Sequence, residues 1–200
     1  MTFHSSLILP LLGASSAAPP PFLLNMQTGG VDLKVVVLGP RPENIKSEVE
    51  RLYSSFPNEA KTRMESISAP NAPGAGTSYF FQVVPVGIKP IQDREIRLHV
   101  LASAAPVSGP DSVIHLLTLK QAACVIILPG TEEEVRQLQA LLKRPEIDLH
   151  SALLITVGSK NGSPKEWHAS SASSVTEAVQ QGTVELHRRL LAAHSVLARQ

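Results

Sequence analysis

Three short hydrophobic runs constrain the fold of this chain most strongly. They read VDLKVVVLG from Val31, ACVIILPG from Ala123 and SALLITVGS from Ser151. Each run is nearly continuous in apolar character, which is typical of a strand buried on both faces of a sheet. Because helices must cover both faces of such a sheet, the runs predict an α/β domain with a mainly parallel sheet.

Amphipathic stretches between these runs predict the helices. NIKSEVERLYSSF places Ile45, Val49, Leu52 and Phe56 at helical spacing. TEEEVRQLQALLKR opens on a Thr and a Glu three residues apart, the spacing of a capping box. Two further helices are predicted over SGPDSVIHLLTLKQA, with Asp111 or Ser112 as its cap, and over about 175–198.

Two strand-like runs, YFFQVVPVG and EIRLHVLAS, are joined by IKPIQDR and predict a hairpin. Residues 58–67 are charged and compatible with a helix, whereas SAPNAPGAGTS and KNGSPKEWHASSASS read as loops. The expected order is β-α-β-β-α-β-α-β-loop-α. It forms one domain over residues 31–200, which follows an N-terminal tail over residues 1–30.

The charge balance and the aromatic content argue against nucleic-acid binding. Lys and Arg number 18 against 17 Asp and Glu, and aromatic residues make up 4% of the chain. Neither an attractive field for phosphates nor a stacking surface for bases is expected. The lone Cys124 lies in an apolar run and is predicted to be a buried hydrophobe. We expect no metal, no cofactor and a cytoplasmic location.

The N-terminal segment MTFHSSLILPLLGASSAAPPPFLL contains a short apolar stretch, Leu7 to Leu12. No Lys or Arg precedes this stretch, and Pro10 interrupts the helix that an export signal needs. These features favour a disordered tail, or a start extended upstream of Met26, over an export signal. An exported protein with an N-terminal anchor is a weaker alternative. No other stretch is long and apolar enough for a membrane span.

The stretch LGPRPENIKS has the outline of a phosphate-binding loop, with Gly39 after a strand and Lys46-Ser47 before a helix. In such a loop, backbone N–H groups wrap the phosphates, the Lys neutralises them and the hydroxyl binds magnesium. This version is one residue too long. Pro42 removes an N–H donor, Glu43 adds a negative charge, and Ile45 stands where a Gly is needed. We therefore interpret Lys46 and Ser47 as part of a solvated first helical turn.

Acidic Glu43 near the start of this helix is favourable to the helix dipole. One hypothesis is that the protein has replaced the charge of a ligand with this carboxylate.

Four segments carry a resemblance to a known family. KVVVLGP, EVERLYSSFPNEAKTRMESIS, TSYFFQVVP and IRLHVLAS resemble the bacterial MglA-type small GTPases, over about Lys34 to Lys160. The resemblance implies a Ras-like P-loop GTPase fold: a mainly parallel sheet with one antiparallel hairpin strand and helices on both faces.

The motifs that perform GTP chemistry in this family are degenerate in the chain. Ala105 and Pro106 stand at the family's γ-phosphate-binding Gly and water-orienting Gln. Gly162 replaces the Asp that reads guanine, although Lys160 is retained and can cover a base. For the magnesium-binding Thr, Thr77 or Ser78 is a poor stand-in.

The resemblance therefore implies a pseudo-GTPase that acts as a protein-interaction module. Its role would be that of a scaffold or regulator in bacterial polarity, motility or surface-machinery assembly. Partners would be a Roadblock-type regulator, an active small GTPase or a subunit of a motility or secretion complex, with contacts over 85–93 and 102–111. The alternative is weak nucleotide or phosphate binding through Lys46, Ser47 and Lys160, with slow or no hydrolysis.

Three other residues invite a functional interpretation. His99 lies in a predicted strand, where the family also has a His, so a structural role is favoured over a catalytic one. No Gly-x-Ser-x-Gly motif supports a serine hydrolase. Trp167 and His168 are either an exposed anchor for a partner or a pair folded back on the last helix.

Overall fold

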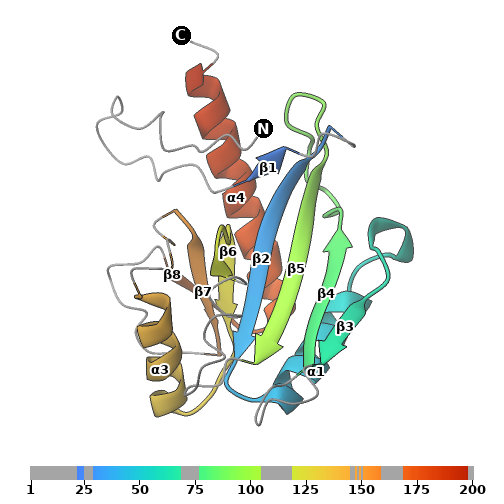
Figure 1. Ribbon diagram of the computed structural model, residues 1–200. Helices are drawn as coiled ribbons and strands as arrows, with labels where there is room; N and C mark the ends of the chain where they lie inside the picture. The colour runs from blue at the N-terminus through green and yellow to red at the C-terminus, as the bar shows by residue number, and fades with distance from the viewer. Residues whose placement is uncertain are drawn as a thin grey trace.

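A computed structural model describes residues 22–24, 29–68, 77–104, 119–144, 147, 149, 151–158 and 169–197. In these residues an eight-stranded sheet is flanked by three α-helices (Figure 1). The strands are β1 Leu23–Leu24, β2 Val31–Gly39, β3 Glu65–Ser68, β4 Thr77–Val83, β5 Ile96–Ala104, β6 Cys124–Ile127, β7 Leu153–Val157 and β8 Ala169–Ala172. The helices are α1 Pro42–Ser54, α3 Glu132–Leu142 and α4 Val175–Leu197, and Asn58–Ala60 forms a 3-10 turn.

The sheet is mainly parallel, as predicted. Its strand order is β3-β4-β5-β2-β6-β7-β8, with β1 paired to the start of β2. The run from β5 to β8 is parallel throughout. The predicted β4–β5 hairpin is antiparallel, with Phe81 opposite Val100.

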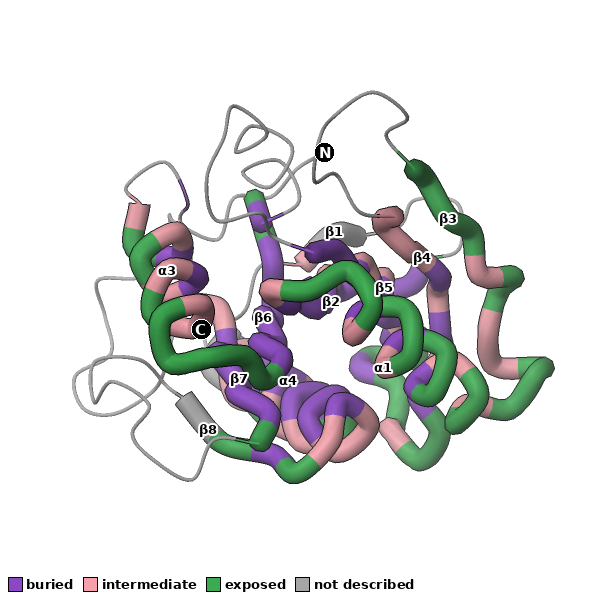
Figure 2. Tube along the Cα trace, turned by 90° about the horizontal axis from the view of Figure 1, so that it is seen from below, coloured by how far each residue is buried: buried purple, intermediate pink, exposed green. Residues whose placement is uncertain are grey.

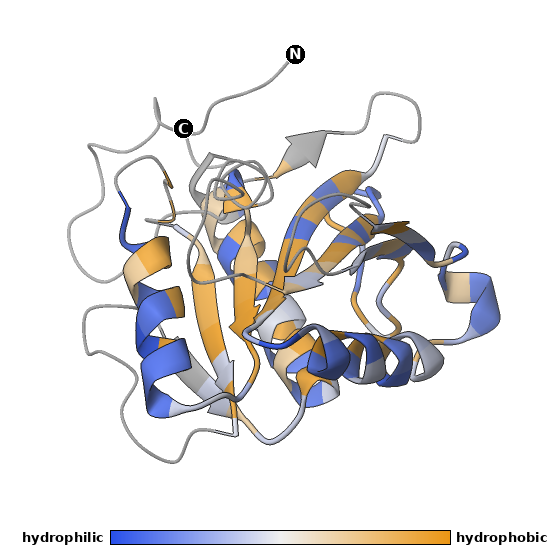
Figure 3. Cartoon of the chain, turned by 60° about the horizontal axis from the view of Figure 1, so that its bottom comes forward, coloured by the Kyte–Doolittle hydropathy of each residue, from blue (hydrophilic) through white to orange (hydrophobic). Residues whose placement is uncertain are grey.

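Helices cover both faces of the sheet, as the continuous apolar strands require. One face of β2, with Val35 and Val37, packs in a single cluster with Val49 of α1 and Leu186 of α4. The other face, with Val36, packs against the buried residues of α3. Figure 3 shows the hydrophobic strands between helices that are apolar on one side only.

Three strands and one helix boundary differ from prediction. Residues 58–67 were expected to be helix-compatible, but Glu65–Ser68 forms the edge strand β3, whose four residues are all exposed. The Ser-rich loop ends in a further strand, β8, which pairs with β7. Phe56 lies beyond the end of α1, although it packs against the core. In the predicted N-terminal tail, Leu23–Leu24 belongs to the sheet as β1.

Other sequence predictions are confirmed. Thr131 and Glu134 form the capping box of α3, and α4 spans most of the predicted 175–198. Cys124 is buried, and burial raises the pKa of its thiol to about 12. The predicted helix over SGPDSVIHLLTLKQA lies outside the described residues except for its last four, which form a turn.

The turn before β5 is strained. Gln92 and Asp93 both have left-handed φ values, 51° and 60°, between residues Ile91 and Arg94, whose backbones exchange two hydrogen bonds. Such a two-residue turn favours Asn-Gly. We expect Gln92→Asn combined with Asp93→Gly to raise the free energy of unfolding by about 1 to 2 kcal/mol, measured by urea denaturation. Equal or lower stability of the double variant would show that these side chains make compensating contacts.

Candidate functional site

The carboxyl edge of the sheet between β2 and β6 is the place where this fold would bind a ligand. After β2 the chain enters α1 on one face, and after β6 it enters α3 on the opposite face. Connections that leave in opposite directions open a crevice, and open α/β sheets bind their ligands in it. Figure 2 views the molecule from this end.

The connection from β2 to α1 has two residues, Pro40 and Arg41, because α1 begins at Pro42. The helix therefore begins two residues earlier than the stretch NIKSEVERLYSSF predicted. Proline at the first helical position lacks only an N–H that the helix leaves unused, and the residue before it is extended, as Arg41 is. Glu43 lies in the first turn, where its charge is favourable to the helix dipole.

Ile45 fills the space around which a phosphate loop would curl. Its side chain is fully buried in the core. A Cβ added to Gly39 would lie 3.0 Å from Cδ1 of Ile45 and 3.1 Å from Cδ1 of Leu128. Gly39 is thus explained by close packing, and no phosphate is needed to account for it.

Lys46 and Ser47 lie within α1 and are exposed. The Ser47 hydroxyl donates to the backbone carbonyl of Asn44 at 3.1 Å, so it is bonded to its own helix. The two residues that a phosphate loop would use are therefore surface residues of a helix. They are solvated, as predicted, but they lie in the second helical turn and not in the first.

A group of four residues, which we call the edge bridge, joins the two sides of the crevice: Pro40, Arg41, Gly130 and Glu134. Arg41 Nε and Glu134 Oε1 are 3.3 Å apart, and a second Arg41 nitrogen donates to Oε2 at 3.4 Å. A Cβ on Gly130 would lie 2.6 Å from Cγ of Pro40, so the two loops are in close contact. These contacts join the β2–α1 and β6–α3 connections across the crevice.

Glu134 is held as a carboxylate by two neighbours. The backbone N–H of Thr131 donates to Oε2 at 2.7 Å. This bond, together with the hydrogen bond from Arg41, lowers the pKa of the Glu134 carboxyl below its usual 4.5. Since the Arg41 charge is already matched, the edge bridge leaves no net positive charge for a phosphate. The hypothesis that Glu43 supplies this charge is not needed, because Glu134 pairs with Arg41.

Replacing Glu134 by Gln is expected to lower the stability at neutral pH and to have less effect in acid. A carboxyl with a lowered folded pKa stabilises the protein above its unfolded pKa and loses that contribution as pH falls through the folded value. The free energies of unfolding of wild type and variant should therefore begin to converge as pH falls below about 4.5, and they should meet below the lowered folded pKa. Urea denaturation from about pH 7 to about pH 3 measures this convergence.

Glu133→Gln is the matched control, because the partners of Glu133 among the described residues, Arg136 and Gln137, belong to its own helix. It should change stability little. If Glu134→Gln behaved like this control at every pH, the ion pair of the edge bridge would contribute nothing to the free energy of unfolding.

Several predicted site residues lie elsewhere or outside the described part. Ala105, Pro106, Lys160 and Gly162 belong to residues that the structure does not describe, as do Trp167 and His168. The hydroxyl groups of the two candidate magnesium ligands are hydrogen-bonded to residues of neighbouring strands. The Ser78 hydroxyl donates to Oγ of Ser103 at 3.0 Å, and Thr77 is hydrogen-bonded through its hydroxyl to Ser68.

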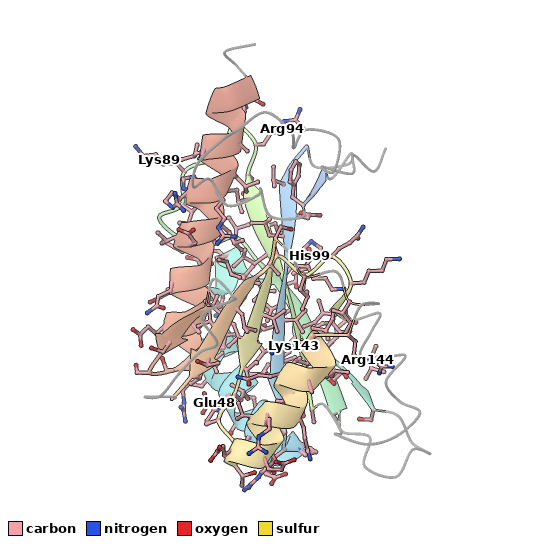
Figure 4. The ribbon with its side chains drawn as sticks, turned by 90° about the vertical axis from the view of Figure 1, so that its left-hand side faces the viewer. Glu48, Lys89, Arg94, His99, Lys143 and Arg144 are labelled. Carbon is pink, nitrogen blue, oxygen red and sulfur yellow. The ribbon has the colours of Figure 1, made fainter. Side chains whose placement is uncertain are left out.

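The segment 85–93, predicted to contact a partner, contains turns and is held to the rest of the protein by two contacts. Ile91 is buried in the core, and a ring nitrogen of His187 on α4 lies 3.0 Å from the carbonyl oxygen of Lys89. Val86, near the start of the segment, is 72% exposed. Figure 4 shows Lys89 beside α4. Of the second predicted contact segment, 102–111, only the end of β5 is described, and it is largely buried.

The described residues contain no group of three or more His, Cys, Asp or Glu able to hold a metal ion. None of the described helices has the length and apolar character of a membrane span. A scan against protein-family models finds no match for this chain. A search of curated proteins finds no similar sequence.

Proposed function

We propose that this chain is a catalytically inactive domain of the Ras-like small-GTPase type, a pseudo-GTPase, and that it acts as a protein-interaction module. The observation that carries the proposal is the edge bridge. Pro40 lies against Gly130, and Arg41 pairs with Glu134, across the crevice in which an active member of such a fold would hold its nucleotide. A domain closed in this way keeps its fold without a ligand and offers its surface to a protein partner.

The architecture agrees with the fold that the resemblance implies. A mainly parallel sheet, the antiparallel β4–β5 hairpin and helices on both faces are the expected features. The degenerate positions Ala105, Pro106 and Gly162 support the same conclusion from the sequence. The resemblance to MglA-type GTPases further suggests a cytoplasmic scaffold or regulator in bacterial polarity, motility or surface-machinery assembly.

The turn over residues 85–93 is the surface proposed for the partner. It presents an exposed apolar side chain, Val86, between the buried Pro85 at its start and the contacts of His187 and Ile91 further along. A fixed surface loses little conformational entropy on binding, which favours affinity. A Roadblock-type regulator, an active MglA-type GTPase or a subunit of a motility or secretion complex is the expected class of partner.

Binding of the purified chain to a Roadblock-type regulator and to an MglA-type GTPase of the same organism tests this function. Isothermal titration should detect binding to one of them without added nucleotide. The affinity should stay the same when GTP or EDTA is added to the calorimeter cell that holds the chain. Val86→Glu should weaken binding by about tenfold or more. Ile67→Glu is the control, because Ile67 is equally apolar and exposed but lies on β3. Binding to neither protein, or equal effects of the two variants, would contradict the proposal.

A further inference from the structure

One edge of the sheet is open to a further strand in the part of the chain that the structure describes. β3 is the outermost strand at this edge and pairs with β4 (Figure 1). All four of its residues are exposed (Figure 2). Of the exposed large apolar side chains among the described residues, only that of Ile67 lies in a strand, and it is 63% exposed. An exposed edge of this kind is a template for another strand.

β3 carries little of the protection that natural proteins give to an edge strand. Lysine and proline commonly block such edges, and the sequence of β3, ESIS, contains neither. A bulge precedes the strand, because the four steps from Lys61 to Glu65 lie opposite three steps from Val83 to Phe80. The bulge limits the regular edge to Glu65–Ser68, in which Glu65 is the charged residue.

The hydrogen bonds of β4 show in which direction its backbone groups point. The N–H of Thr62 donates to the carbonyl oxygen of Gln82 at 2.9 Å, so the backbone groups of Gln82 point toward the side of β3. Backbone groups alternate in direction along a strand. Those of Phe80 and Ser78 therefore also point toward β3.

This alternation fixes which backbone groups of β3 face outward. Glu65 and Ile67 are the register partners of the two β4 residues that point toward β3, so their N–H and C=O groups bond to β4. The N–H and C=O groups of Ser66 and Ser68 then point away from the sheet. These two residues provide the hydrogen-bonding groups that a further strand would meet.

We propose that two copies of this chain associate through β3, in antiparallel orientation, with Ile67 of one copy opposite Ile67 of the other. Ser66 of each copy then lies opposite Ser68 of the other copy, and each such pair exchanges both of its backbone hydrogen bonds. Ile67 lies between these pairs in a non-hydrogen-bonded position, where opposing side chains are closest. The contact buries the exposed apolar side chain of the edge against its own copy.

Charge and polarity select this register among the symmetric ones. A two-fold axis at Glu65 would place two carboxylates opposite each other, which is destabilising. An axis at Ser66 would place Ile67 opposite the Glu65 carboxylate of the other copy. An axis at Ser68 would leave only the last residues of the two strands paired. With the axis at Ile67, the apolar side chains meet, and the two Glu65 residues lie about 13 Å apart along the strands.

A second copy is the occupant that fits this edge. The partner strand must be short, must have an apolar residue at its centre and must place no charge opposite Ile67. β3 of another copy meets all three requirements, and the symmetry forms every contact twice. Because two short strands bury less surface than a standard interface, we expect a weak dimer with a dissociation constant of about 100 µM.

The dimer contact is separate from the partner surface proposed at residues 85–93. Ile67 lies opposite Ser78 near the start of β4, whereas the turn follows the end of β4 at Val83. The five residues from Ser78 to Val83 span about 17 Å. Dimerisation and partner binding can therefore occur together, and the outcome of one test does not decide the other.

Sedimentation velocity of the wild-type chain over a range of about 5 to 500 µM tests the proposal. The mean sedimentation coefficient should rise with concentration from that of a monomer toward that of a dimer. A chain that stays monomeric up to about 500 µM would overturn the proposal. If such a monomer lost its binding to the proposed protein partner through Ile67→Glu, the edge would serve that partner and not a second copy.

Two substitutions separate strand pairing from other kinds of association. Ile67→Glu would place two carboxylates opposite each other and should weaken the dimer about tenfold or more. Ser66→Pro removes an outward N–H, leaves the bonds between β3 and β4 in place and should weaken the dimer as strongly. Val86→Glu is the control, because Val86 is exposed and apolar but lies outside β3. A dimer that persists unchanged in both β3 variants contradicts the proposed contact.

A cross-linking variant tests the register by a gain of signal. Ile67→Cys would bring two thiols together at the two-fold axis, within reach of a disulfide. Oxidised glutathione should convert this variant into a covalent dimer on a non-reducing gel. Glu65→Cys is the matched control and should stay monomeric, since its two thiols would be about 13 Å apart. Cys124, the chain's only native cysteine, is buried. Equal cross-linking of the two variants would exclude the proposed register.

Discussion

Alanine at position 45 is expected to lower the free energy of unfolding by about 2 to 5 kcal/mol. Ile45 is fully buried at the start of α1, and its Cδ1 packs against Gly39. Truncation removes three carbons from this contact and leaves a void that the short β2–α1 connection cannot close by moving. Urea denaturation of the wild type and of Ile45→Ala gives the difference directly.

Lys46→Ala is the matched control for this prediction. Lys46 is the next residue of the same helix and is exposed, so its truncation should change stability by no more than about 0.5 kcal/mol. If Ile45→Ala were as mild as Lys46→Ala, the position would be a loop residue, as in an open phosphate site, and the account of a filled crevice would be wrong.

Gly130→Ala is expected to destabilise the protein by about 1 to 3 kcal/mol. The new methyl group would lie 2.6 Å from Cγ of Pro40 and 2.9 Å from Oε2 of Glu134. The carboxylate can move, but the proline ring is bonded to its own backbone nitrogen and cannot rotate away, so the two loops would have to separate. Thermal and urea denaturation measure the loss, and a neutral effect would mean that the crevice is open.

A double-mutant cycle identifies Pro40 as the cause. In a Pro40→Ala background the contacting Cγ is absent, so Gly130→Ala should cost about 1 kcal/mol less than in the wild type. Additive effects of the two substitutions would assign the cost of Gly130→Ala to something other than the contact across the crevice.

The buried elements of the fold could be predicted from the sequence, because burial leaves a pattern. VDLKVVVLG and SALLITVGS are apolar throughout and became β2 and β7. Two of the missed strands, β3 and β8, have no such pattern. Every residue of β3, Glu65–Ser68, is exposed, and β8 consists of small Ala and Ser residues. Their pairing depends on the neighbouring strand, which a local pattern does not contain.

The closed site could be predicted only in part. Pro42 and Glu43 are typical residues for the start of a helix, and they show in retrospect where α1 begins. The capping box of Glu134 was visible as Thr131 and a Glu three residues later. Its second partner, Arg41, lies 93 residues away in the chain. Only the fold brings Arg41 and Glu134 together, so the edge bridge could not be predicted from the sequence.

Calorimetric titration of the purified chain with GTP, GDP and ATP in magnesium buffer tests the central claim most directly. With Arg41 paired to Glu134, Pro40 close to Gly130 and Ile45 close to Gly39, the account predicts dissociation constants weaker than about 1 mM or no measurable binding. A micromolar dissociation constant for any of the three nucleotides would contradict it.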